Sequence, residues 1–97
     1  MMKDFYVYIL ADRRNGRTYV GFTNDLLRRV HEHKNDLAEG YTKRYGTHRL
    51  VYFEHAETAV SGIAREKYLK AMGRAEKLAL IEEMNLTWRD LFYTLGQ

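Results

Sequence analysis

An Asn-Gly pair at residues 15 and 16 separates two runs of apolar and aromatic residues, and this feature constrains the fold most. Residues 5–11 and 17–22 are rich in aromatic and β-branched residues, which favour strands. Asn and Gly both tolerate the positive φ angles that a tight hairpin turn requires. The sequence therefore predicts a β-hairpin, so the sheet is at least partly antiparallel.

Three helices and one more strand are predicted after the hairpin. Thr23 or Asn24 can cap a helix that runs to about Asn35, because their side chains accept hydrogen bonds from a first helical turn. Residues 36–47 are polar and contain glycine, which predicts a loop. The remaining elements are a strand over residues 49–54, a helix from Thr58 to about Met72 with Gly73 as its C′ residue, a third helix through Met84, and a short terminal turn that Thr87 caps.

This order, β-β-α-β-α-α, predicts an α+β fold in which a small three-stranded antiparallel sheet is flanked by helices. We expect a single domain over residues 1–97, because a chain of 97 residues fits one compact core. The absence of cysteine excludes disulfides and thiolate metal sites. No segment has the length of a signal peptide or a membrane span, so a cytoplasmic location is expected. The net charge of +3 weakly favours an anionic partner such as nucleic acid.

The hairpin predicts two tyrosines on one face of the sheet. Alternate side chains of a strand point to opposite faces, and a loop of two or four residues places Tyr19 and Gly21 on the face of Tyr8. A four-residue loop sets Tyr8 opposite Gly21. Glycine weakens a strand unless a ligand or another group must approach closely. The two phenols are therefore interpreted either as the walls of a notch or as ordinary aromatic packing.

The first helix distinguishes two neighbouring arginines. At 3.6 residues per turn, Arg29 and His33 border the apolar stripe at the seam between core and solvent, whereas Arg28 points to solvent beside Glu32. A guanidinium matches the oxygens of a phosphate. Arg29 and His33 could therefore bind an anion, or they could pair with a carboxylate of the same chain.

The second helix supplies one candidate metal ligand. Glu66 is expected to border an inner face that includes Ile63 and Lys67, and Gly62 one turn earlier would leave room beside it. No cluster of histidines or carboxylates has the spacing of a zinc site. A lone glutamate suits Mg²⁺-like coordination with water and substrate oxygens, and an ion pair with Lys70 is the alternative.

These features together resemble the GIY-YIG nuclease superfamily, and within it the small stand-alone bacterial (UPF0213) proteins. The resemblance rests on "YVY" at residues 6–8, "YVG" at residues 19–21, an arginine ten residues after Tyr19 and a glutamate in a later helix. Segments such as "YVGFTNDLLRRVHEHK" and "RLVYFE" are similar too, and the likeness covers about residues 5–92.

The resemblance implies a metal-dependent endonuclease that hydrolyses phosphodiester bonds in nucleic acid, with DNA as the expected form. Tyr8, Tyr19, Arg29 and His33 match catalytic positions, and Glu66 matches the residue that binds Mg²⁺ or Mn²⁺. Tyr8 would accept a proton from water once a nearby cation, such as the metal, Arg29, His33 or Lys67, lowers its pKa from about 10. His33 is the alternative base.

Two other functions remain open. The chain could bind nucleic acid on the same scaffold with little or no catalysis, through the basic candidates Arg13, Arg14, Arg17, Lys43, Arg44 and Lys67. It could instead be a protein-interaction domain whose tyrosines are core. A homodimer or a protein partner is also open, because so small a domain has little surface for specificity.

Overall fold

The computed structural model describes residues 4–38 and 40–95. Its centre is a three-stranded antiparallel sheet in the order β2-β1-β3, made of β1 (Phe5–Ala11), β2 (Thr18–Thr23) and β3 (Arg49–Ala56). Strand β1, the most apolar of the three, lies in the middle, and β2 is an edge strand. The predicted α+β class and the antiparallel sheet are confirmed.

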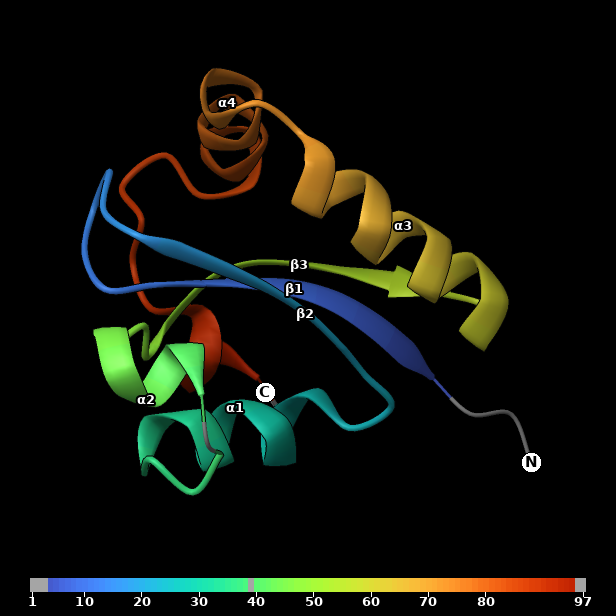
Figure 1. The fold of residues 1–97 in the computed structure, drawn as a ribbon, viewed down its shortest axis with the longest axis horizontal. Helices are drawn as coiled ribbons and strands as arrows, with labels where there is room; N and C mark the ends of the chain where they lie inside the picture. The colour runs from blue at the N-terminus through green and yellow to red at the C-terminus, as the bar shows by residue number, and fades with distance from the viewer. Residues whose placement is uncertain (1–3, 39, 96–97) are drawn as a thin grey trace.

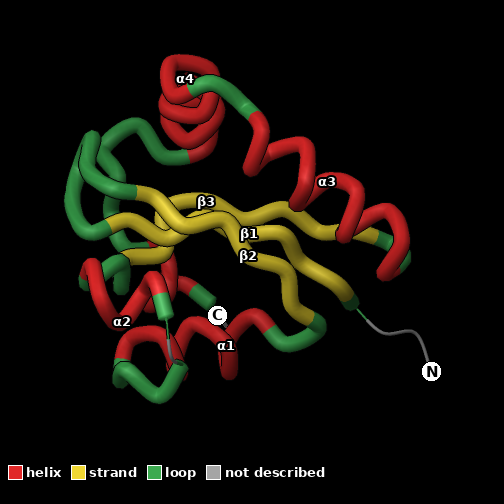
Figure 2. Tube along the Cα trace, viewed as in Figure 1, coloured by secondary structure: helices red, strands yellow, loops and turns green. Residues whose placement is uncertain are grey.

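Helices cover both faces of the sheet (Figures 1 and 2). One face carries the two later helices, and the other carries the earlier helices together with a short terminal 3₁₀ helix. None of the helices in the described part of the chain is long and apolar enough to cross a membrane. The helices are α1 (Leu26–Lys34), α2 (Tyr41–Tyr45), α3 (Ala59–Ala71), α4 (Arg74–Met84) and η1 (Leu91–Thr94).

The hairpin has a four-residue loop, residues 13–16. The Asp12 N–H donates to the Arg17 carbonyl at 3.2 Å and the Gly16 N–H to the Arg13 carbonyl at 3.0 Å, which closes the loop. Asn15 takes the positive φ of 57°. The resulting register sets Tyr8 opposite Gly21, as the four-residue alternative predicts.

The alternation of β1 divides the core into two apolar clusters. Val7, Ile9 and Ala11 are buried under α3 and α4, whereas Tyr8 and Leu10 are buried on the face of α1. This separation agrees with the period of two that the sequence predicts. Tyr8 and Tyr19 are therefore held on the face that α1 covers.

Three local predictions are wrong. Residues 36–47 are not all loop, because they contain α2. The N-cap of α1 is Asp25, whose side chain accepts the Arg28 N–H at 3.1 Å, instead of a residue before it. In the same way Asp90, not Thr87, caps the terminal turn. Gly73 does follow Met72, the C-cap of α3, as predicted, but its φ of −61° is not left-handed, and the residue is also the N-cap of α4.

Helix α3 packs against the sheet with the side opposite to the one that its apolar residues predict. Val60 is 80% exposed and Tyr68 is exposed too, whereas Gly62 and Leu69 face the sheet. A Cβ at Gly62 would lie 2.4 Å from Cε2 of Phe22, so glycine is required for this close packing. The room at Gly62 therefore serves Phe22, not Glu66.

Candidate active site

The site begins where the Tyr8 ring lies over Gly21 on the edge strand. A Cβ at Gly21 would be 2.3 Å from Cζ and 2.4 Å from the hydroxyl oxygen of Tyr8, so only glycine leaves this position open. The notch that the sequence predicts is thus filled by the phenol itself. The ring is buried, and its hydroxyl end lies over the Gly21 position of β2, an edge strand of the sheet.

A hydrogen-bond chain joins Tyr8 to α1 and α2. The Tyr8 hydroxyl lies 3.0 Å from Nε2 of His33, and Nδ1 of His33 lies 2.8 Å from the hydroxyl oxygen of Thr42. Thr42 has no counterpart among the sequence candidates, because the segment that carries it is predicted as a loop. Helix α2 buries Thr42 directly against the imidazole.

His33 is buried, not placed at the seam between core and solvent. Only 2% of its surface is exposed, and this burial, assisted by the Arg29 cation, lowers its pKa to about 4. The ring is therefore neutral at pH 7. A neutral imidazole accepts a hydrogen bond at one nitrogen and donates from the other, so the Tyr8 hydroxyl can donate to Nε2 while Nδ1–H donates to Thr42.

Burial also raises the pKa of Tyr8, to about 12, and the nearby Tyr19 adds to this effect. Arg29 lowers the same pKa through hydrogen bonding and charge, without overcoming burial. The expectation that nearby cations make Tyr8 acidic is therefore wrong for the protein alone. Neutral His33 adds no positive charge, and Lys67 is exposed on the outer side of α3.

Arg29 joins this group through its position on α1. Its guanidinium donates to Oε1 of Glu32 at 3.1 Å and also interacts with Tyr8. Burial opposes its charge, but these two partners outweigh burial and raise the pKa of Arg29 above its usual value. The predicted pairing of Arg28 with Glu32 is wrong, since Arg28 lies 3.9 Å from Asp25 instead.

Glu66 approaches from the opposite layer, on α3. Its side chain is 19% exposed and forms an ion pair with Lys70 at 3.1 Å, as the alternative prediction states. Its charge also raises the pKa of Tyr8, although Tyr8 belongs to the α1 face. Glu66 therefore acts electrostatically on Tyr8 from the α3 side of the sheet.

The surroundings of Glu66 suit a hard divalent cation better than zinc. Among residues 4–38 and 40–95, no three histidines or carboxylates are grouped as metal ligands. Mg²⁺ is commonly held by one or two carboxylates, with water and substrate phosphates completing its shell. The half-buried Glu66 carboxylate fits that role, because its partner Lys70 is half exposed and can move aside.

Aromatic rings continue outward from Tyr8. The ring centroids are 6.5 Å apart for Tyr8–Tyr19, 5.9 Å for the stacked pair Tyr19–Tyr41, and 4.7 Å for Tyr41–Tyr45. The Arg17 guanidinium lies 4.7 Å over the Tyr45 ring. We call Tyr8, Tyr19, Tyr41 and Tyr45 the tyrosine ladder; two of its members come from α2 and were missed because the sequence places them in a loop.

The basic candidates lie in three places. Arg44 is 5.3 Å from the Tyr45 ring at the outer end of the tyrosine ladder, and Lys43 is exposed beside it on α2. Arg13 and Arg14 are exposed in the hairpin loop. Lys67 lies on the outer side of α3, apart from the sheet.

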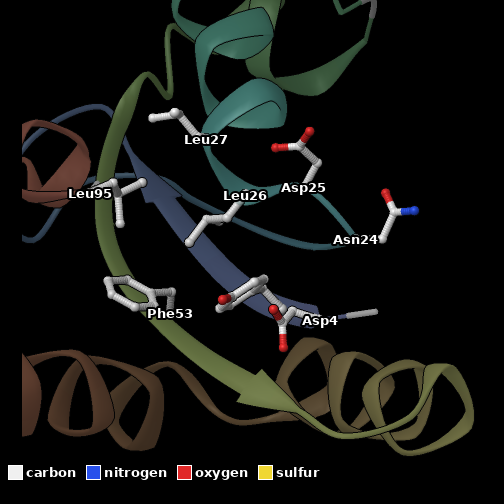
Figure 3. A pocket seen from close by; sticks show the side chains of 8 residues that line it. Asp4, Asn24, Asp25, Leu26, Leu27, Phe53 and Leu95 are labelled. Carbon is white, nitrogen blue, oxygen red and sulfur yellow. The ribbon is translucent and has the colours of Figure 1, made fainter. Parts of the chain in front are cut away.

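A separate hollow of about 360 Å³ lies at the N-terminal end of α1 (Figure 3). It contains none of the catalytic candidates. Its rim carries the carboxylates of Asp4 and Asp25, which would repel a phosphate. The other lining residues are Tyr6, Asn24, Leu26, Leu27, Phe53 and Leu95.

The buried His33 makes stability depend on pH. Its pKa is about 4 in the folded protein and near 6.5 when unfolded, so the unfolded chain binds the extra proton as the pH falls. We expect the free energy of unfolding to have its highest value above pH 6.5 and to fall by up to about 3 kcal/mol towards pH 4. Urea titrations across this range measure the loss. His33→Leu should show a shallower pH dependence than His31→Ala, whose side chain is exposed, and equal slopes would contradict the assignment.

Known proteins that are similar to this chain identify its family. The family model described as "GIY-YIG catalytic domain" matches residues 4–79. The UPF0213 protein CPE1444 of Clostridium perfringens is 38% identical over 81 residues, which cover 84% of this chain and 86% of that protein. The UPF0213 protein HQ_3675A of Haloquadratum walsbyi is 32% identical over 82 residues, covering 84% of this chain and 92% of that protein.

A solved structure has a similar fold. The solution NMR structure of the UPF0213 protein BH0048 from Bacillus halodurans aligns with a TM-score of 0.56 and 26% identity, over 97% of this chain and 98% of that one. The matched family is one of nucleases that generally use a divalent metal ion, and it suggests nucleic-acid binding. The chain therefore belongs to the GIY-YIG family of nuclease domains and, within that family, to the UPF0213 group.

Proposed function

We propose that the protein is a metal-dependent endonuclease that hydrolyses phosphodiester bonds in nucleic acid, expected to be DNA. The observation that carries this proposal is the meeting of unlike groups at Tyr8: the Arg29 cation, the neutral His33 imidazole and the Glu66 carboxylate all act on one phenol. These four residues come from three elements, β1, α1 and α3, and the glycine at position 21 leaves the space in which the phenol lies.

Glu66 would hold a divalent ion, Mg²⁺ or Mn²⁺, which when bound neutralises charge on the scissile phosphate and the leaving oxygen. Lys70 would release the carboxylate to do so. Arg29 would bind the non-bridging phosphate oxygens, since its side chain is 38% exposed and its fork of donors matches two oxygens at once.

Tyr8 and His33 would move the proton together. A phenol with a pKa of about 12 does not ionise at pH 7, so Tyr8 does not act as a free phenolate before substrate binds. It can take a proton from the attacking water while it passes its own to Nε2 of His33, 3.0 Å away. The Thr42 hydroxyl would accept from Nδ1–H and hold the imidazole in the tautomer that accepts at Nε2.

The tyrosine ladder would guide the strand away from the centre. Nucleobases stack on aromatic rings without strong sequence preference, and cations beside the rings bind phosphates. Tyr41 is exposed, and Arg17 and Arg44 both lie against Tyr45 at the end of the ladder. This arrangement favours contact with unstacked bases near the cut.

The experiment is cleavage of single-stranded, duplex and branched DNA, and of RNA of the same sequence, with Mg²⁺, Mn²⁺ or EDTA. Metal-dependent cutting supports the nuclease. The internal pairing of Arg29 with Glu32 and of Glu66 with Lys70 favours the alternative, a binding module with little catalysis. That alternative predicts salt-dependent binding that is the same with and without metal, and no cutting. Absence of both binding and cutting at low salt would overturn both.

A further inference from the structure

A second hollow, of about 280 Å³, lies between the hairpin loop and the start of α4. Its lining is almost entirely basic or backbone, and no carboxylate side chain lines it. We call it the arginine hollow. Its lining residues are Arg13, Asn15, Gly16, Arg17 and Arg74.

Arg74 ties α4 to the hairpin and is itself fixed in the process. Its Nη2 donates to the Asn15 carbonyl at 2.6 Å and to the Gly16 carbonyl at 3.0 Å. These two bonds use both hydrogens of that nitrogen. Within the described residues, its Nε and Nη1 have no hydrogen-bond partner, so the guanidinium can still offer donors to a ligand.

The positions of the other two arginines, Arg13 and Arg17, are not explained by side-chain bonds of this kind. Arg13 forms no ion pair with any residue that the structure describes, and Arg17 has the Tyr45 ring as its side-chain partner. The nearby Asp12 carboxylate accepts the Arg17 backbone N–H at 2.8 Å through Oδ1, and within the described residues it forms no ion pair with these guanidinium groups. Burial and the Arg74 cation also lower the pKa of Lys77, which adds another basic group close by.

Converging cations repel one another unless an anion joins them. Guanidinium groups bind phosphate oxygens in pairs of parallel hydrogen bonds, and two or three of them around one hollow match a phosphate group. Arg14 is a neighbour in the same loop but does not line the hollow. Arg13, Arg17 and Arg74 therefore differ from Arg14 in their position around the hollow and not in their charge.

We infer that the arginine hollow binds a phosphate group, and that in the nuclease proposed above it holds a backbone phosphate of the strand that leaves along the tyrosine ladder. Arg17 connects the two features, because it lines the hollow and covers Tyr45. From Tyr8 to the end of β1 at Ala11 the chain advances three residues, roughly 10 Å at the rise of a β-strand, and Arg13 lies beyond that end in the hairpin loop. The hollow thus lies well beyond the reacting phosphate. It would bind the nucleic-acid strand at a fixed distance from that phosphate, on one side of it.

Binding is tested by NMR titration of backbone amides at low ionic strength, with inorganic phosphate as one probe and a short oligothymidylate as the other. Saturable shifts at Asn15, Gly16 and Arg74 are expected with both probes. Arg13→Gln is the main variant, since its side chain holds no other group in the described structure. It should weaken phosphate binding by about tenfold, and the matched control Arg14→Gln by less than about twofold.

Each outcome has a meaning. Equal weakening by Arg13→Gln and Arg14→Gln would show diffuse attraction and overturn the site, as would shifts that do not saturate. Binding of free phosphate with no effect of Arg13→Gln on the oligothymidylate would overturn the role in strand binding. If the wild-type protein shows no nuclease activity but the phosphate-induced shifts are observed, the proposed function is refuted and the hollow is left as a phosphate site.

Discussion

Replacing Arg29 by alanine is expected to lower the rate of phosphodiester cleavage by roughly 10²–10³-fold, the usual cost of removing one preorganised donor to a developing anion. The loss should fall mainly on kcat, because the contact strengthens as charge develops on the phosphate oxygens. Arg29→Lys should recover little, since an ammonium cannot present two parallel donors. Cleavage under single-turnover conditions with Mg²⁺ measures the effect.

Arg28→Ala is the matched control for this prediction. It removes the same charge from the adjacent position of α1, but its side chain points away from the site towards Asp25. Its effect on cleavage should stay within a few-fold. A loss as large as that of Arg29→Ala would indicate that the general positive charge of α1, and not the placement of one guanidinium, supports cleavage.

A second measurement separates the role of Arg29 from folding. Arg29 lowers the pKa of Tyr8, so the pKa of that phenol should rise further in Arg29→Ala, whereas Arg28→Ala should leave it unchanged. Ultraviolet titration of the tyrosines at high pH detects this shift without any substrate. An unchanged titration would show that Arg29 and Tyr8 are not coupled and would contradict the site described here.

The sheet and the α1 side of the site could be predicted because their signals are local. Alternation along β1 separates Tyr8 from its neighbours, and the four-residue loop sets the register that brings Gly21 opposite. The turn of α1 places Arg29 near the same face. The burial of His33 and the contributions of Tyr41, Thr42 and Tyr45 could not be predicted, since all of them depend on α2, whose residues carry the polar, glycine-rich composition of a loop.

The α3 side could not be predicted from periodicity. Apolar residues lie on both sides of this helix, with Val60 and Tyr68 on one and Leu69 on the other, so the pattern does not select a face. The choice is made by close packing, because only Gly62 allows Phe22 to approach. The same choice leaves the Glu66 side chain only 19% exposed, although the inner face predicted from the apolar residues is wrong.

Replacing Trp88 by alanine is expected to cost about 3–5 kcal/mol of folding free energy, the range for removing a buried aromatic side chain. Trp88 is fully buried in the cluster under α4, and its Nε1–H donates to Glu82 at 2.9 Å. Small domains have a total of about 5–15 kcal/mol, so this variant should be close to unfolding at room temperature. Urea denaturation followed by circular dichroism measures the loss, with the exposed Leu86→Ala as the control.

The backbone at Trp88 sharpens this prediction. Its φ of 58° is in the left-handed region, where a side chain costs roughly 1–2 kcal/mol relative to glycine. The cavity is nearly the same whether alanine or glycine replaces the indole, but only glycine relieves the backbone strain. Trp88→Gly should therefore be more stable than Trp88→Ala by roughly 0.5–1 kcal/mol. This difference already includes the greater freedom of glycine in the unfolded chain. A clearly less stable glycine variant would mean that the indole, and not the packing around the turn, determines this conformation.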